Sequence, residues 1–261
     1  MIVKSVSLAS LMVITNQNIY NFFFQNKPSK PIIVKTQDEK KLDNPVWFSL
    51  LETHQSFAVD YGNIKFYHPD YCPFGGFEKG TAIAKSIDEY SAKVDNFFIV
   101  GEKPELSNLL KLNKEVVCLQ MIVYNPIDIL INDQIIKLTD EHIDALYELV
   151  NLVQPGYFKK KTALLGNYYG IFKNGELVAV TGERMQMNHF VEVSAVVTHP
   201  NHTGKGYAKQ LVVHTVNEIF NQNKTPYLHV IEDNIGAIQL YEKLGFTIRR
   251  KISFWNITKQ I

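Results

Sequence analysis

Apolar and polar positions follow two distinct periods in the second half of the chain. Alternation with a period of two, or a short run that is apolar throughout, predicts a strand, whereas apolar residues three or four apart predict a helix. The chain is therefore expected to form strands over 131–138, 168–173, 176–184, 191–198, 226–232 and 247–255. Helices are expected after Thr139 and over 206–220 and 234–244. This order predicts an α/β fold, a mixed sheet with helices on its faces.

Turn and cap residues mark the ends of several of these elements. Asn174-Gly175 lies between two predicted strands and is the strongest short signal for a hairpin. Thr139 is suited to cap the first helix, and Pro155-Gly156 would end it. One face of that helix is predicted to carry Ile143, Leu146, Val150 and Val153.

The first half shows weaker patterning. It predicts a helix over 81–92 and buried strands over 96–100 and 116–124, after an aromatic, turn-rich stretch over 61–76. No residues in this half have a spacing typical of a catalytic or metal site, and Asn125-Pro126 marks a boundary. We therefore expect an N-terminal extension over 1–30, an accessory domain over 31–126 and a chemistry-bearing domain over 127–261.

Composition restricts the function classes. The 261 residues are 46% hydrophobic and 20% charged, which is enough for a packed core, and 27 basic against 26 acidic residues leave a formal charge of +1. Bulk charge therefore predicts neither a nucleic-acid partner nor an acidic membrane partner. Cys72 and Cys118 exclude a disulfide scaffold, have no metal-like spacing and are expected as buried free thiols.

The N-terminus leaves two interpretations open. The weakly apolar run Val6–Ile14 has the size of a signal-peptide core, but no small-residue cleavage site follows it and it is too short to span a membrane. An ordinary strand or a loosely packed extension is the alternative. The expected location is therefore the cytoplasm.

Two glycines stand where the strand 191–198 gives way to a helix. Gly204 and Gly206 allow the backbone to turn sharply, and the first turn of a helix leaves unpaired N–H groups, so the segment can bind a phosphate or pyrophosphate. A plain tight turn is the alternative. The segment lacks the Gly-Lys-Ser/Thr of a nucleotide-binding loop and the third glycine of a dinucleotide site.

The stretch from Asn234 to Phe246 forms a closing unit. Asn234 is suited to cap a helix, Gly245 to stop it, and Phe246 falls where a Schellman cap makes its apolar contact. Together with the strand before His199-Pro200 and the loop 203–208, these residues resemble the GNAT superfamily of acyl-CoA-dependent acyltransferases. The nearest resemblance is to the branch similar to glycine N-acyltransferases, and it covers Ile131 to Trp255.

The resemblance implies a GNAT-like acyltransferase fold in the second half. Weaker similarities, at 43–47 and 119–121, suggest that the first half is a degenerate GNAT-like copy or an accessory α/β lid. The co-substrate would be acetyl-CoA or another acyl-CoA, with no metal. The implied CoA-binding residues are Val196, Val197, Thr198, Thr203, Gly204, Lys205, Gly206, Tyr207, Ala208 and Asn234. Thr203 departs from the family, which usually has Gln or Arg there, so we expect weakened CoA binding.

Direct transfer to an amine needs a base for the amine, donors for the oxyanion and a proton for the leaving thiolate. Glu192 is the candidate base, because burial in an apolar strand would raise its pKa. Strict alternation would place Ser194, Val196 and Thr198 on the face of Glu192. Alternatively, Glu192 is exposed or paired with Arg184.

Tyr241 matches the position from which the family often protonates the thiolate, although a tyrosine at this helical spacing also fits a core role. Other polar residues have two interpretations each. His199 is expected in a turn, His202 near the anion loop, and His229 either facing the acceptor pocket or buried as a structural residue. Arg184 is a candidate for an acceptor carboxylate or for a surface pair.

The expected acceptor is a small-molecule amine or an amino acid, without nucleic-acid or membrane partners; the oligomeric state stays open. Two rival functions remain. The first is a CoA-binding regulatory module whose acid and base are vestigial, and the second is an unrelated α/β phosphate-binding domain. Release of free thiol from acetyl-CoA distinguishes an enzyme from the first, and selective stabilisation by CoA distinguishes it from the second.

Overall fold

The computed structural model describes residues 36–260. The apolar run Val6–Ile14 and the N-terminal extension predicted over 1–30 lie outside these residues. Within 36–260, none of the helices has the length and apolar content needed to cross a bilayer.

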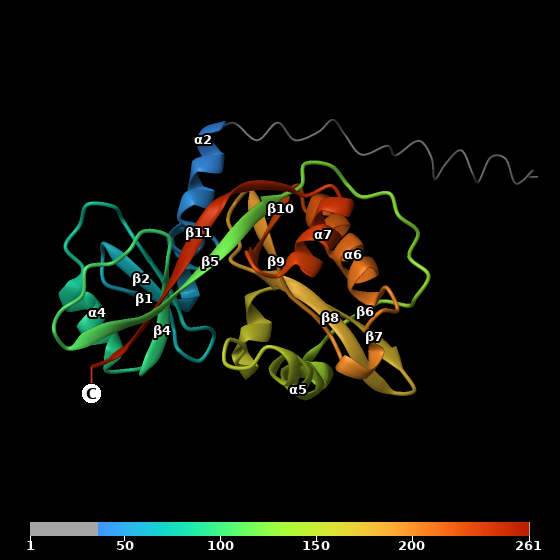
Figure 1. Cartoon of the computed structure of the whole chain (residues 1–261), viewed down its shortest axis with the longest axis horizontal. Helices are drawn as coiled ribbons and strands as arrows, with labels where there is room; N and C mark the ends of the chain where they lie inside the picture. The colour runs from blue at the N-terminus through green and yellow to red at the C-terminus, as the bar shows by residue number, and fades with distance from the viewer. Residues whose placement is uncertain (1–35, 261) are drawn as a thin grey trace, which may run out of the picture. The chain divides into compact units, whose positions relative to one another are not determined.

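One mixed sheet of 11 strands organises the described chain, in the order β1-β2-β3-β4-β11-β5-β10-β9-β8-β7-β6 (Figure 1). Two neighbouring pairs are parallel, β3 with β4 and β9 with β10, and the other pairs are antiparallel. The strands are β1 Ala58–Asp60, β2 Ile64–Tyr67, β3 Phe74–Phe77, β4 Asn96–Val100, β5 Leu110–Ile122, β6 Ile136–Lys137, β7 Tyr168–Lys173, β8 Glu176–Arg184, β9 Phe190–Thr198, β10 Thr225–Ile231 and β11 Thr247–Lys259.

Helices cover the sheet. The α-helices are α2 Thr36–Glu39, α3 Pro45–Leu51, α4 Ala84–Ser91, α5 Ile143–Val153, α6 Tyr207–Asn221 and α7 Ile235–Lys243. Short 3-10 helices are η1 Lys40–Asp43, η2 Gln55–Phe57, η3 Asp140–His142, η4 Lys160–Leu165 and η5 Pro200–His202. Residues of α6 and α7 share a core with Val191 and Val193 of β9, whereas α5 packs with Val197, so these helices lie on opposite faces.

The long strands β5 and β11 lie side by side in the middle of the sheet (Figure 1). Outward from this pair the order is similar in both directions. On one side β4 pairs in parallel with β3 and antiparallel strands follow; on the other side β10 pairs in parallel with β9 and antiparallel strands follow. The two halves of the chain therefore repeat one strand pattern and exchange strands at the centre.

The mixed α/β fold predicted from the sequence is confirmed. Asn174 and Gly175 both have positive φ, 51° and 84°, as a two-residue type I′ hairpin requires. Thr139 lies at the N-cap of η3, immediately before α5, as predicted. One detail of that helix was wrong: Leu149 is buried with Leu146 and Val150, whereas Val153 is 38% exposed in the last turn.

The strand predicted over 131–138 was also wrong in extent, since only β6 is a strand. The preceding segment crosses α6, and side chains of that helix satisfy its backbone. The N–H groups of Asn132 and Asp133 donate to Oε1 of Gln210, at 2.7 and 2.9 Å, and Ile127 donates to Asn217. Partners on a helix remove the need for a strand partner.

A bulge interrupts β9. Val180 pairs with Val197 and Gly182 with Ser194, so two residues oppose one, and Ala195 has a φ of 49°. The strict alternation predicted along this strand is therefore wrong beyond Ser194. Val196 packs with the core on the α6 and α7 side, and Val197 packs on the α5 side.

The sheet continues across the boundary predicted at residue 126. β5 comes from the first half and lies between β10 and β11, which come from the second half. The described residues, 36–260, also belong to one compact unit. The division into domains over 31–126 and 127–261 stays a prediction, while the strands of the two halves pair in one sheet.

Candidate functional site

A cavity opens where β9 and β10 diverge. The two strands pair in parallel only from Phe190–Thr225 to Glu192–Tyr227, and the bulge at Ala195 follows directly. Because a bulge bends its strand, the ladder does not resume, and a cavity of about 410 Å³ lies between the strands.

Two groups of side chains line this cavity. The first comes from the end of β9 and from α6 and α7: Val196, Ala208, Asn234, Ala237, Leu240 and Tyr241. The second surrounds a buried ion pair and includes residues of the first half: Arg184, Glu192, His229, Phe74, Phe98, Cys118, Tyr157 and Phe254. Among residues 36–260, no three His, Cys, Asp or Glu side chains gather as a metal site would need.

The ion pair joins neighbouring strands. Arg184 ends β8 opposite Glu192 in the β8–β9 register. Its Nε lies 2.8 Å from Oε2 of Glu192 and its Nη2 lies 3.0 Å from Oε1, a bidentate geometry. Nδ1 of His229 is 2.8 Å from the same Oε1. The guanidinium also stacks on Phe74, 4.8 Å from the ring centre.

The predicted raised pKa of Glu192 was wrong, because only half of its environment was counted. Burial by itself raises the pKa of this carboxyl, which is 1% exposed. The charge of Arg184 and hydrogen bonds from His229 and Arg184 outweigh burial and lower the pKa to about 2. The paired alternative considered from the sequence is therefore the one observed, and the pair is buried.

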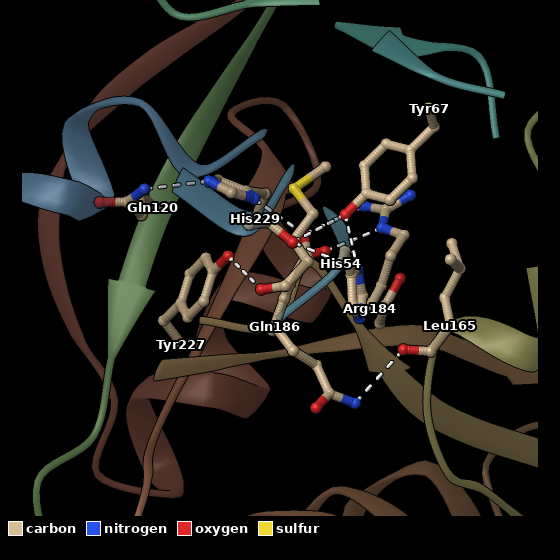
Figure 2. Close-up of polar contacts among 12 residues, drawn as sticks. His54, Tyr67, Gln120, Leu165, Arg184, Gln186, Tyr227 and His229 are labelled. Atoms are coloured by element: carbon tan, nitrogen blue, oxygen red, sulfur yellow. Dashed lines mark hydrogen bonds and ion pairs between the residues drawn. The ribbon is translucent and has the colours of Figure 1, made fainter. Parts of the chain in front are cut away.

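Gln120 determines which nitrogen of His229 carries the proton. The Gln120 amide is oriented by two partners, since Nε2 donates to the Leu42 carbonyl at 2.7 Å and Oε1 accepts from Arg249 at 2.8 Å. Its second N–H faces Nε2 of His229 at 3.0 Å, as Figure 2 shows. Nε2 must then accept, so Nδ1 carries the proton and donates it to Glu192. Both ring nitrogens are thereby occupied.

Tyr241 faces the cavity from α7. The predicted Schellman cap is present: Phe246 N–H donates to the Tyr241 carbonyl and Gly245 N–H to the Glu242 carbonyl, each at 3.0 Å. Phe246 packs on the Tyr241 ring, with centres 5.8 Å apart. The Tyr241 hydroxyl makes no hydrogen bond to the described residues, and burial raises its pKa to about 12. It is therefore held as a protonated phenol.

The glycine turn lies at the start of α6. Gly204 and Gly206 have φ values of 76° and 79°, which other residues rarely adopt, and Gly206 is the N-cap. Thr203, Gly204, Lys205 and Gly206 are exposed. The Tyr207 side chain packs in the core beneath Lys173, so only its backbone is available to a ligand. The first turn thus presents free backbone donors at a positive helix end.

The remaining predicted CoA-binding residues divide between the cavity and its surroundings. Val196, Ala208 and Asn234 line it, and the Asn234 side chain also caps α7 by accepting from the Ala237 N–H at 3.2 Å. Val197 and Thr198 do not line it, because the bulge turns Val197 to the α5 core. The roles of all these residues stay predictions.

Sequence reasoning missed the contribution of the first half. Phe74, Phe98 and Cys118 come from β3, β4 and β5 and line the cavity, although no spacing marked them. The only available signal was the richness in aromatic residues. His199 lies in a turn as expected, where its Nδ1 accepts from the Asn201 N–H at 3.2 Å.

Comparisons with known proteins agree with this geometry. The family model described as FR47-like protein matches residues 168–255, which include β7 to β10 and most of β11. A GNAT-family protein from Novosphingobium aromaticivorans is similar at 30% identity, with a TM-score of 0.78, over 84% of this chain and 99% of that one. That match is long enough to include both halves. No curated protein matches the chain.

Two more distant structures share the fold. A GCN5-related N-acetyltransferase from Kribbella flavida is 13% identical, with a TM-score of 0.56, over 83% of this chain and 94% of that one. A GCN5-related N-acetyltransferase-like protein from Streptococcus suis is 12% identical, with a TM-score of 0.54, over 86% of this chain and 98% of that one.

Proposed function

The chain belongs to the GNAT family of acetyltransferases, and we propose that it is an acyl-CoA-dependent N-acyltransferase. It would move an acyl group, acetyl by default, from a CoA thioester to the amine of a small molecule or an amino acid by direct transfer. The observation that carries this proposal is the cavity between β9 and β10. Val196, Ala208 and Asn234, predicted to bind CoA, line the same space as Tyr241 and Glu192.

The residues at the cleft fit CoA as a co-substrate. The pyrophosphate would bind the backbone N–H groups of the loop 203–208, since these donors converge at the positive end of α6. The pantetheine arm would lie between the diverging strands near Asn234. The oxyanion that forms on the thioester would be stabilised by backbone N–H groups near the bulge at Ala195, which borders the cavity.

Glu192 is proposed to orient the acceptor rather than to deprotonate it. A carboxyl whose pKa is about 2 is a weak base for an amine. Its Oε1 accepts from His229 and Arg184, whereas among residues 36–260 Oε2 accepts only from Arg184, which leaves one acceptor position on Oε2 for an amine N–H. The amine would thus bind as the free base, with His229 and Arg184 fixing the carboxylate that aligns it.

Tyr241 is proposed as the acid. The amine nitrogen attacks the thioester carbonyl, the C–S bond breaks, and the Tyr241 hydroxyl gives its proton to the departing thiolate. The proton released by the amine returns to Tyr241 through water. The place of Tyr241 in the cavity wall supports this role, although burial, by raising its pKa, makes the phenol a weaker acid than an exposed tyrosine.

Thiol release tests the proposed function. The purified protein is incubated with acetyl-CoA and a panel of primary amines, and free CoA thiol is titrated. Amine-dependent release is expected. Stabilisation by CoA without release in the presence of any amine would instead favour the vestigial CoA-binding module, whereas stabilisation by ATP but not by CoA would favour an unrelated phosphate-binding domain.

We also propose a specific branch of the family for this chain and an origin for its first half. The chain would belong to the branch similar to glycine N-acyltransferases, with the first half a degenerate GNAT-like copy. The repeated strand order on both sides of β5 and β11 supports the second point. The two halves can be superposed according to this strand order. A failure of β3 and β4 to superpose on β9 and β10 would contradict the proposal that the first half is a degenerate copy.

A further inference from the structure

A small side cavity of about 30 Å³ adjoins the main cavity. The two share Arg184, Ser194, Ala195, Tyr157 and Gln154 in their walls. Tyr168 and Thr162 line only the small one, and the Thr162 hydroxyl is already bonded to the Tyr71 carbonyl. The volume suffices for one oxygen-bearing group or for a water molecule.

Tyr168 makes this side cavity unusual. The residue is 3% exposed, and its hydroxyl has no hydrogen-bond partner among the described residues. A buried hydroxyl without a partner is costly, so a group that enters the space and accepts a hydrogen bond removes that cost. Burial raises the pKa of Tyr168, so the phenol remains a donor.

Arg184 adds further donors beside it. Its Nε and one N–H of Nη2 are taken by Glu192, and Nη1 donates to none of the residues in the described chain. The charge of Arg184 is nevertheless matched by the Glu192 carboxylate in a buried pair. An added carboxylate would leave the buried set with net negative charge beside Glu192, whereas a neutral oxygen would not.

Aromatic rings enclose the adjacent part of the main cavity. Phe98 lies 5.9 Å from Phe74 and 5.5 Å from Tyr157, and Phe254 lies 5.7 Å from Phe74, measured between ring centres. With Cys118 and Val116 they offer apolar contact. The acceptor region thus combines an apolar wall with a recess that supplies hydrogen-bond donors.

We infer that the acceptor is an amine with an apolar or aromatic body and a neutral, hydrogen-bond-accepting oxygen, which binds at Tyr168 and Arg184. This rests on the proposed function and specifies its acceptor class. An amide carbonyl next to the amine-bearing carbon has the required chemistry. Tyr168 is thereby a specificity-determining residue.

Three matched probes test the inference with acetyl-CoA: phenethylamine, phenylalanine amide and phenylalanine. They share the aromatic body and differ in having no oxygen group, a neutral carbonyl or a carboxylate. At equal concentrations of the uncharged amine, since the three amines differ in pKa, we expect the amide to have the highest kcat/KM, about fivefold above phenethylamine, which is the effect of one hydrogen bond. Phenylalanine should be the poorest. A higher kcat/KM for phenylalanine than for phenylalanine amide would overturn the inference that the acceptor carries a neutral oxygen group.

Tyr168→Phe removes only the donor hydroxyl. It should lower kcat/KM for the amide about fivefold and leave phenethylamine unchanged. Its melting temperature should be equal or higher, because an unpaired buried hydroxyl is lost. Tyr169→Phe is the control, since Tyr169 packs on His214 away from the cavity. An unchanged preference for the amide in Tyr168→Phe would show that the side cavity holds only water.

The experiments distinguish a wrong acceptor class from a wrong proposed function. If acetyl-CoA raises the melting temperature but none of the three amines releases thiol, the inferred acceptor class is wrong and the CoA site stands. If acetyl-CoA neither stabilises the protein nor is consumed with any amine, the proposed function itself is wrong.

Discussion

At the scale of single residues, the site depends on how neighbours alter ordinary side chains. Glu192 is buried, yet Arg184 and His229 keep it ionised, so burial alone was a poor guide to its chemistry. Tyr241 has no such partners within residues 36–260, and burial alone raises its pKa. The roles proposed for the two residues therefore differ, with Glu192 a fixed acceptor of hydrogen bonds and Tyr241 a proton donor.

Tyr241→Phe is expected to lower kcat by roughly 100-fold while CoA affinity stays unchanged, because general-acid assistance is lost without loss of packing. Steady-state rates and CoA titration measure the two effects separately. Tyr147→Phe, on α5 away from the cavity, should behave as the unaltered protein. A variant with full turnover would remove the acid role from Tyr241.

At the scale of elements, two local irregularities create the cleft. The bulge in β9 ends its pairing with β10, and the glycine turn starts α6 with a left-handed N-cap. A regular strand would have continued the ladder and closed the cavity. Both irregularities lie at the predicted CoA site.

Gly206→Val is expected to weaken CoA binding by at least about tenfold, because a side chain would stand where backbone N–H groups meet the pyrophosphate. The positive φ of 79° also adds strain. Gly62→Val is the matched control, since Gly62 has a φ of 83° in an open turn of the first half. Equal CoA affinity in the two variants would contradict the assignment of the loop.

At the scale of the whole molecule, the two halves are joined by the sheet and by a buried polar cluster. In the first half, Nδ1 of His54 lies 2.8 Å from the Tyr67 hydroxyl and 3.2 Å from that of Ser49, and Gln120 of the first half bonds His229 of the second (Figure 2). Burial, with a smaller contribution from Lys224, lowers the pKa of His54 to about 4.

This predicts how stability depends on pH. Between pH 6.5 and about 4 the unfolded chain binds a proton at His54 that the folded chain does not. The free energy of unfolding should therefore fall by about 3 kcal/mol as the pH drops through this window. Urea unfolding at a series of pH values measures it, in a single transition because the sheet is continuous.

His54→Gln should lose the part of this pH dependence that His54 contributes and keep the part from His214, whose pKa burial also lowers, whereas His68→Gln, at an exposed position, should keep both. The measured quantity is the slope of the free energy of unfolding against pH. A lower absolute stability of the His54 variant therefore does not affect the comparison. An identical slope in both variants, or two separate transitions in the parent chain, would contradict this account.

The second-half elements were predictable because their signals are local. The Asn174-Gly175 hairpin, the Thr139 and Asn234 caps and the Gly245 stop act within a few residues, and the structure contains each of them. The strand predicted over 131–138 failed because Gln210, distant in sequence, satisfies its backbone. The bulge at Ala195 carries no turn residue and left no local sign.

The sequence by itself determined the order of elements, their caps and the glycine turn, since each depends on residues a few positions apart. Only the tertiary structure decided the ionisation of Glu192, the proton position on His229 and the walls of the cavity proposed to hold the acceptor. Those properties arise where β3, β4, β5, β8, β9, β10 and β11 meet. Burial and pairing there depend on residues more than half the chain apart, such as Phe74 and Phe254, and short-range patterns cannot report them.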